Sequence, residues 1–325
     1  MGRRLDVKVG WRCNNNCIFC AQAHKRHLGD LSTEEVKKRI LEGWEDGCDE
    51  LVLTGGEPTI RKDIFELVRY AHELGFKIIQ IQSNGRMFYY KDFVKKIIEA
   101  GANEFSPAIH GHNPLIHESQ TRAKGSFKQT YEGIKNLKEF GQYVITNTVI
   151  TKINYKYLPK IAEMLIKLNV DQFQLAFVHP VGNALKNFDL VVPRKSKVMK
   201  YVHEALRLAI DAGYKPGMVM VEAFPFCFMR GFELFCSELY MPPAEVMEKG
   251  LKISRFEEWR RISGKIKFDK CSKCKFEKIC EGPWKEYPER YGCEEFVPVI
   301  GDKIKDPEEL FEKVPAFQRI ALNEV

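Results

Sequence analysis

Short apolar runs alternate with helix-like segments along the first two-thirds of the chain. Between the runs, apolar residues such as Val36 and Ile40 recur every three or four positions, which is the period of an amphipathic helix. Ser32 and Glu35 form a capping-box sequence at the start of this segment. Six β-then-α units in series predict an α/β fold, a partial (β/α)6 barrel with parallel strands. The predicted strands are residues 5–9, 50–54, 77–82, 103–109, 143–149 and 171–177.

The alternation of strands and helices ends after a helix predicted at residues 195–212. Residues 224–241 are rich in aromatic side chains and cysteine, and no clear β–α repeat follows them. We therefore predict two domains, a core at residues 1–213 and a small C-terminal cysteine-rich domain at residues 214–325.

Composition and charge narrow the class of protein. The 325 residues are 44% hydrophobic and 29% charged, which suits a sizeable core and excludes global disorder. No apolar run is long enough for a membrane span, and the first ten residues lack the apolar stretch of a secretory signal. We therefore expect a cytoplasmic location. The net charge of +7 is too mild to imply nucleic acid.

The ten cysteines are unevenly distributed. Three lie within eight residues near the start of the chain, and six follow position 226. In a reducing compartment, clustered cysteines indicate metal ligands or catalytic thiols rather than disulfides.

The N-terminal triad has the spacing C-x3-C-x2-C and directly follows the first predicted strand. Three thiolates on one loop hold three corners of a cubane iron–sulfur cluster and leave the fourth iron open to another ligand. Two alternatives are a zinc site completed by His24 or His27, and a loop of packed free thiols. The triad consists of Cys13, Cys17 and Cys20.

The triad resembles the signature of the radical S-adenosylmethionine (SAM) superfamily, in which an aromatic residue, here Phe19, precedes the last cysteine. The resemblance extends to residues 54–58, Thr-Gly-Gly-Glu-Pro, after the second strand, and to Ser-Asn-Gly at residues 83–85 after the third. It covers roughly residues 5–212. All three motifs lie at the ends of successive strands, as a single site requires.

The resemblance implies that the triad holds a 4Fe-4S cluster whose open iron chelates SAM. It also implies that the two glycines approach the methionine part of SAM, that the glutamate accepts its ammonium group, and that neighbouring side chains meet its adenine and ribose. The cofactor-binding residues implied in this way are Phe19, Gly55, Gly56, Glu57, Ser83, Asn84 and Ser106.

Polar residues at the later strand ends are further candidates. His110, His112 and His179 are candidate catalytic residues, and Asn147 and Gln174 lie on the fifth and sixth strands. The alternative for each is an ordinary solvated loop residue. His110 and His112 also suggest a metal pair, although no third ligand is evident.

The C-terminal sequence Cys271-x2-Cys274-x5-Cys280 resembles the auxiliary-cluster part of SPASM and twitch domains, which append 4Fe-4S clusters to radical SAM cores. Trp284 stands where a further cysteine of the full SPASM pattern belongs, so we expect one auxiliary cluster. Its fourth ligand is Cys227 in our preferred assignment, with two alternatives and with a zinc ribbon as the rival for the whole site. The two alternative ligands are Cys293 and Cys236.

The predicted function is reductive cleavage of SAM to a 5′-deoxyadenosyl radical that abstracts hydrogen from a substrate. The resemblance implies a peptide or protein substrate first, and a small metabolite, cofactor precursor or RNA as alternatives. It also implies a low-potential electron donor such as ferredoxin or flavodoxin. The rival class is a non-catalytic iron–sulfur carrier or zinc-stabilised binding protein. A basic run at residues 265–278 fits a solvated face, or docking of an acidic electron donor or RNA.

Overall fold

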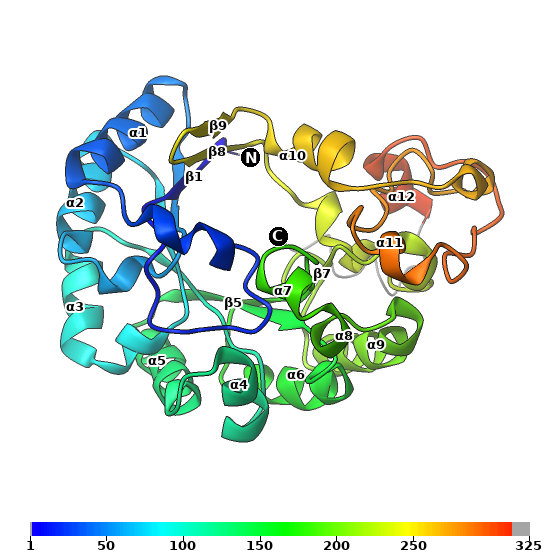
Figure 1. Cartoon of the computed structure of the whole chain (residues 1–325), viewed down its shortest axis with the longest axis horizontal. Coiled ribbons are helices and arrows are strands. Elements are labelled where there is room, and N and C mark those ends of the chain that lie inside the picture. Colours follow the sequence, from blue (N-terminus) through cyan, green and yellow to red (C-terminus); the bar gives the residue numbers. More distant parts are fainter. Residues whose placement is uncertain (1, 314–325) are drawn as a thin grey trace.

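The computed structural model describes residues 2–313, so residues 314–325 of the predicted second domain lie outside the described part of the chain. The fold is α/β, with helices around the outside of one curved, mostly parallel sheet (Figure 1). The strands are β1 (Arg4–Lys8), β2 (Glu50–Thr54), β3 (Ile78–Ser83), β4 (Glu104–Pro107), β5 (Tyr143–Ile150), β6 (Gln172–Phe177), β7 (Val219–Glu222), β8 (Ala244–Glu248) and β9 (Leu251–Ile253). The α-helices are α1 (Thr33–Glu45), α2 (Ile64–Leu74), α3 (Lys91–Glu99), α4 (Pro114–Thr121), α5 (Ser126–Glu139), α6 (Leu158–Lys167), α7 (Asn183–Lys186), α8 (Phe188–Val191), α9 (Lys195–Asp211), α10 (Phe256–Trp259), α11 (Pro288–Tyr291) and α12 (Pro307–Lys313).

The strand order in the sheet is β7-β6-β5-β4-β3-β2-β1-β8-β9. Every neighbouring pair is parallel except β8 and β9, which form an antiparallel hairpin. The six predicted strands are present and adjacent in sequence order, which confirms the α/β class and the parallel sheet. Because all of these strands run the same way, the loops that follow them meet at one end of the sheet.

Alternation along each strand separates an apolar outer face from a polar inner face. Leu5 and Val7 of β1 are fully buried, as is Phe105 of β4. Asp6, which lies between Leu5 and Val7, and Ser106, which follows Phe105, point to the other face and line a central cavity. The apolar residues pack beneath the surrounding helices, and this packing supplies most of the core.

Local signals fix the ends of the first two helices. The Ser32 hydroxyl accepts a hydrogen bond from the Glu35 amide, and the Glu35 carboxylate accepts one from the Ser32 amide, so the predicted capping box is present. Gly75 ends α2 with φ 103°, a left-handed conformation that glycine adopts without strain. The helix predicted at residues 195–212 is α9, which ends at Asp211.

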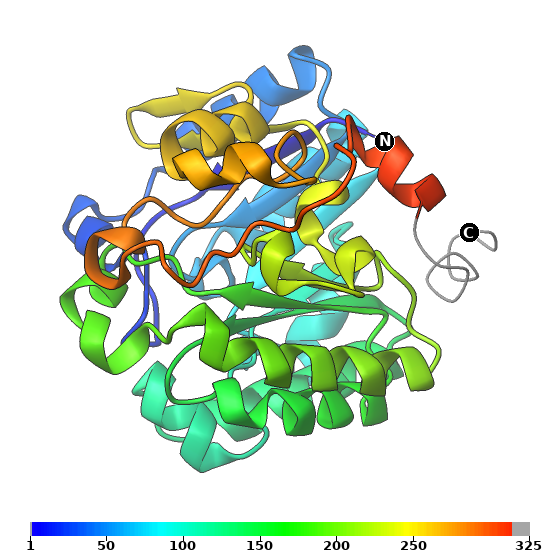
Figure 2. The same cartoon turned by 90° about the vertical axis from the view of Figure 1, so that its right-hand side faces the viewer.

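Strands β7, β8 and β9 come from a region in which we predict no strand, and this part of the prediction is wrong. β7 extends the sheet beyond β6, whereas β8 pairs in parallel with β1. Residues 255–313 then lie across the opening between the two edges of the sheet (Figure 2). These strands are only three to five residues long, and β8 contains two glutamates, so the apolar pattern does not reveal them.

No helix within residues 2–313 is long and apolar enough to cross a membrane.

Candidate functional site

The three cysteines of the triad lie on the loop that leaves β1, drawn in dark blue in Figure 1. Each is partly exposed. Burial, and then the neighbouring thiols of Cys20 and Cys13, raise the pKa of Cys17. The three thiols share one short loop after β1, as ligands of one cluster can.

Gly55 and Gly56 let this loop lie directly against the end of β2. A Cβ atom on Gly56 would stand 2.1 Å from the carbonyl oxygen of Arg12, and one on Gly55 would stand 2.4 Å from that of Gly10. The amide of Gly56 donates to the Gly10 carbonyl at 2.8 Å. The glycines thus have a packing role that the sequence does not reveal. Their predicted contact with SAM stays a prediction.

Glu57 joins the ends of β2 and β3. Its side chain is buried, and its Oε1 accepts hydrogen bonds from the Ser83 hydroxyl at 2.7 Å and from the Thr59 amide at 3.0 Å. Its Oε2 accepts from the Asn84 amide at 2.6 Å. Burial raises the pKa of Glu57, while these donors lower it. Oε2 therefore has one protein donor, and the predicted contact with the SAM ammonium stays a prediction.

Asn84 connects this hydrogen-bonded cluster to the triad. Its Nδ2 lies 3.9 Å from the Cys13 sulfur and donates to Asn14 Oδ1 at 2.6 Å. Arg86, two residues later, donates to the Asn14 carbonyl at 2.6 Å. The ends of β1, β2 and β3 therefore converge on the cysteine loop, as the order of the three motifs predicts.

Two asparagines beyond β6 hold the other side of the triad loop. The Asn183 side chain donates to the Cys17 carbonyl at 3.0 Å, and its amide donates to the Cys20 carbonyl at 2.9 Å. The Asn187 side chain donates to the Ile18 carbonyl at 2.9 Å. Sequence reasoning missed both residues, because an asparagine in a segment without apolar periodicity gives no signal of such a contact.

Phe19 and His110 pack against each other behind the triad. Phe19 is buried, and its ring meets that of His110 edge-on with centroids 4.8 Å apart. His110 Nδ1 accepts a hydrogen bond from the Val149 amide, and burial lowers the pKa of His110 to about 3. The ring is therefore neutral and fixed. The catalytic role of His110 rests on the sequence alone.

The other histidine candidates lie apart from one another. His112 lines an outer hollow beside Tyr131 and Lys160. His179, after β6, stacks on Trp284 at 3.8 Å with its Nε2 3.3 Å from a Glu286 carboxylate oxygen.

The two alternative zinc ligands lie in the short 3-10 helix that follows the triad. His24 and His27 are both exposed there. Within residues 2–313, no three His, Cys, Asp or Glu side chains are placed to hold a single metal ion.

A polar cavity of about 680 Å³ fills the inside of the curved sheet. Successive strands contribute their inward residues, and only three of these are among the candidates predicted from sequence. The sequence does contain polar side chains at alternate strand positions. The same pattern is typical of a strand with one solvent-exposed face, so it does not predict a cavity. The inward residues include Asp6, Gln80, Gln82, Glu104, Ser106, Asn147, Gln172, Gln174 and Glu222.

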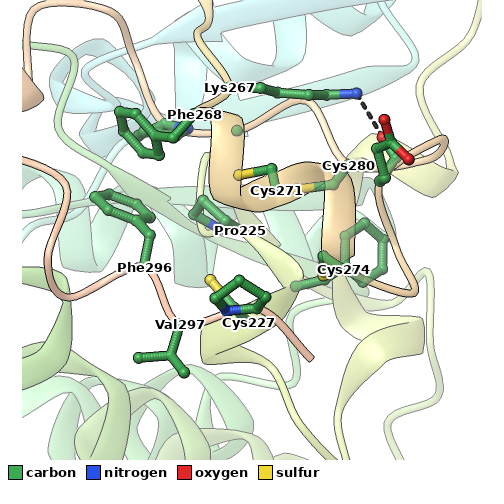
Figure 3. A pocket seen from close by; sticks show the side chains of 14 residues that line it. Pro225, Cys227, Lys267, Phe268, Cys271, Cys274, Cys280, Phe296 and Val297 are labelled. Carbon is green, nitrogen blue, oxygen red and sulfur yellow. Dashed lines mark hydrogen bonds between the residues drawn. The ribbon is translucent and has the colours of Figure 1, made fainter. Parts of the chain in front are cut away.

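Four C-terminal cysteines line one small apolar cavity, the cysteine cavity, shown in Figure 3. They are Cys227, Cys271, Cys274 and Cys280. Burial, followed by the other three thiols, raises the pKa of Cys227 to about 12. Neither Cys236 nor Cys293 lines this cavity.

Part of the basic run beside these cysteines is not a solvated face. Lys265 is buried, and its ammonium lies 3.8 Å from the centre of the Trp284 ring. Desolvation lowers the pKa of Lys265, while Glu238 opposes that change. Arg260 is also buried and meets carboxylates of Glu222 and Glu281 at 2.6 and 3.2 Å. This network joins the polar cavity to the C-terminal segment.

Comparison with known proteins defines the class. A family model described as the Radical SAM superfamily matches residues 7–165, which include the triad and both later motifs. Residues 7–165 of this chain therefore match the radical SAM superfamily. It is 33% identical over 184 residues to the AdoMet-dependent heme synthase of Oleidesulfovibrio alaskensis, covering 56% of this chain and 47% of the relative. It is 29% identical over 187 residues to the probable GTP 3′,8-cyclase of Sulfolobus acidocaldarius, covering 56% of this chain and 58% of the relative.

The chain spans about half the length of the curated relatives that it matches. Native anSMEcpe with bound AdoMet aligns with a TM-score of 0.67 at 15% identity, covering 99% of this chain and 100% of the other. Streptococcus suis SuiB bound to S-adenosylmethionine aligns with a TM-score of 0.62 at 17% identity, covering 93% of this chain and 76% of the other. At these identities the likeness shows a shared fold.

Proposed function

We propose that this protein is a radical SAM enzyme that abstracts a hydrogen atom from its substrate. The observation that carries the proposal is the convergence of three strand ends on the triad. Asn84 reaches the Cys13 sulfur, the Glu57 amide donates to the Arg12 carbonyl at 2.8 Å, and Glu57 binds the residues after β3. The match to the superfamily assigns a chemistry to this arrangement.

The triad fits a 4Fe-4S cluster, because three partly exposed thiols share one loop and leave one iron for another ligand. When bound, the cluster supplies the electron that cleaves SAM to methionine and a 5′-deoxyadenosyl radical. The chain's own residues hold this site in place. Glu57 fixes the two strand-end loops, Asn183 and Asn187 fix the loop carbonyls, and buried Phe19 excludes water behind the triad. We retain SAM contacts for the motif residues and for Ser106, which faces the polar cavity.

A peptide or protein is our preferred substrate. SuiB bound to its precursor peptide SuiA shares this fold, with a TM-score of 0.56 at 14% identity. The polar cavity, with a volume of about 680 Å³, has room for a side chain of a peptide. A small molecule is the second candidate, because the curated relatives are named as a heme synthase and a GTP cyclase.

We propose further that the cysteine cavity holds an auxiliary cluster in a C-terminal domain, with Cys227 as the fourth ligand. Four thiols line this one apolar cavity, and thiolates are donors that both clusters and zinc take, but their placement in this structure does not hold a single ion. The cavity measures about 30 Å³, so a cubane cluster requires the loops carrying these thiols to move apart. Counting metals decides between the two: about eight iron atoms per chain support two cubanes, and about four with one zinc support a ribbon.

The proposed activity is tested with protein purified without oxygen and loaded with iron and sulfide. SAM is then added together with dithionite, which replaces the ferredoxin or flavodoxin as electron donor. The reaction should yield 5′-deoxyadenosine. Cys17→Ala should abolish this product, and Cys48→Ala, at a buried thiol outside both cysteine groups, should not. Product that forms equally in Cys17→Ala, or none in the wild type, would sink the proposal.

A further inference from the structure

A hollow on the outer surface carries a concentration of positive charge that the proposed function does not use. It has a volume of about 510 Å³, and we call it the basic groove. Four cations and three tyrosines line it, and no carboxylate does. The lining residues are Lys152, Ile153, Tyr155, Lys156, Tyr157, Pro193, Arg194, Lys197 and Tyr291.

The basic groove lies at the same end of the sheet as the cysteine triad. Residues 152–157 directly follow β5, and residues 193–197 lead into α9 after β6. The Lys152 amide donates to the Val191 carbonyl at 2.7 Å, which joins the groove to α8. Asn187, at the start of α8, bonds the triad loop. A ligand in the groove is therefore held beside the loops that build the proposed active site.

The four cations of the groove are exposed and form no ion pair with any carboxylate of residues 2–313. Lys152 donates to the Asp189 carbonyl and Arg194 to the Tyr291 carbonyl, so the hydrogen bonds of these two side chains go to neutral oxygens. Many exposed lysines elsewhere do pair, such as Lys91 with Glu139 at 2.7 Å. Four unpaired cations around one hollow form a site of strong positive potential, which favours an anionic ligand.

The tyrosine rings of the groove are already in contact with other groups. Arg194 lies 4.7 Å above the Tyr291 ring, which also packs on Phe188. Tyr155 packs edge-on against Tyr201, and Tyr157 packs against His112. Surfaces that bind single-stranded nucleic acid offer open aromatic faces on which bases stack. Here the rings instead support the cations, which favours carboxylates over nucleobases as the ligand.

We propose that the basic groove binds an acidic segment of a polypeptide. Glutamate or aspartate side chains would pair with the four cations, and the Arg194 guanidinium is able to hold a carboxylate with two hydrogen bonds. The inference goes beyond the proposed function. Binding at the groove requires neither a cluster nor SAM, so its test and the test of SAM cleavage succeed or fail separately.

The test is fluorescence anisotropy with the full chain and a fluorescein-labelled octaglutamate peptide. The informative variant is Lys156→Gln/Lys197→Gln, since both side chains are exposed and neither donates a hydrogen bond that holds the fold. The matched control is Lys38→Gln/Lys95→Gln, which removes the same charge at two side chains that are 76% and 67% exposed on α1 and α3. Labelled octaglutamine and labelled eight-nucleotide polyuridine are the competing probes.

We expect octaglutamate to bind and octaglutamine not to bind. Removing two of the four cations should weaken octaglutamate binding about tenfold, and added salt should weaken it further. The control variant should bind octaglutamate within about twofold of the wild type, because it leaves the groove intact. Equal binding of octaglutamate to both variants, or no binding at all, would overturn the proposal. Tighter binding of polyuridine than of octaglutamate would also overturn it and assign the groove to nucleic acid.

Discussion

Asn187 offers a sharp test of how the triad loop is held. Its Nδ2 donates to the Ile18 carbonyl at 2.9 Å and to the Asn183 carbonyl at 3.0 Å. Asn187→Ala removes both hydrogen bonds, each contributing about 1 kcal/mol of net stability. We therefore expect the free energy of unfolding to fall by about 2 kcal/mol. The bond to Ile18 acts on the loop itself, and its loss should raise the open population of that loop about fivefold.

The matched control is Asn136→Ala on α5. The Asn136 side chain also donates to two carbonyls, those of Phe88 at 3.0 Å and Tyr89 at 2.9 Å, but it does not contact the triad loop. Asn136 is also buried, so its loss should destabilise the fold at least as much.

The assay is the rate at which iron leaves the reconstituted protein in the presence of a chelator. Iron release should be about fivefold faster in Asn187→Ala and unchanged in Asn136→Ala, with both variants less stable to denaturant. Equal release rates in the two variants would refute the reasoning, because iron loss would then follow global stability alone.

Three further predictions concern the rest of the molecule. Cys227→Ser should lower the metal content of the reconstituted protein by one auxiliary centre, whereas Cys293→Ser should leave it unchanged; the opposite result would assign the ligand to Cys293. Burial raises the pKa of Asp6 from 3.8 to about 6, so folding loses stability as pH rises through this range. Asp6→Asn should therefore stabilise the protein by about 3 kcal/mol at pH 8 and by little at pH 4, as measured by melting temperature. An equal change in melting temperature at the two pH values would contradict a raised pKa of Asp6. Arg260→Gln removes a buried cation from the buried carboxylate of Glu281 and the partly buried carboxylates of Glu222 and Glu238. It should cost about 3–5 kcal/mol in urea denaturation, against under about 1 for exposed Arg255→Gln, and equal costs would contradict the network.

The parallel sheet could be predicted because its strands carry a strong local signal. Each predicted strand contains apolar residues that pack beneath helices, such as Leu5 and Phe105, and each precedes a segment of helical period. The convergence of the three motifs followed from topology, since parallel strands place their following loops at one end. β8 could not be predicted in the same way. Its place beside β1 depends on pairing across about 240 residues, and Glu245 and Glu248 hide its apolar pattern.

The site was less predictable wherever backbone packing or polar alternation decides it. Gly55 and Gly56 suggested close approach to SAM, which stays a prediction; their contact with the loop that carries the cysteines was not predicted. The side chains of Asn183 and Asn187 each donate one hydrogen bond to a loop carbonyl, and no residue pattern predicts such a contact. The resemblance implied the grouping of Cys227 with the C-terminal cysteines, but spacing alone does not, because they are more than forty residues away and meet only where the segments after β7 fold back onto one another.

The most direct test of the central claim is electron paramagnetic resonance of the triad centre alone. A Cys271→Ser/Cys274→Ser variant removes two thiols of the cysteine cavity and leaves the triad intact. After loading with iron and sulfide and reduction by dithionite, it should show one cluster signal whose g values change when SAM is added, because SAM binds the open iron. A cluster signal that SAM leaves unchanged would contradict the account.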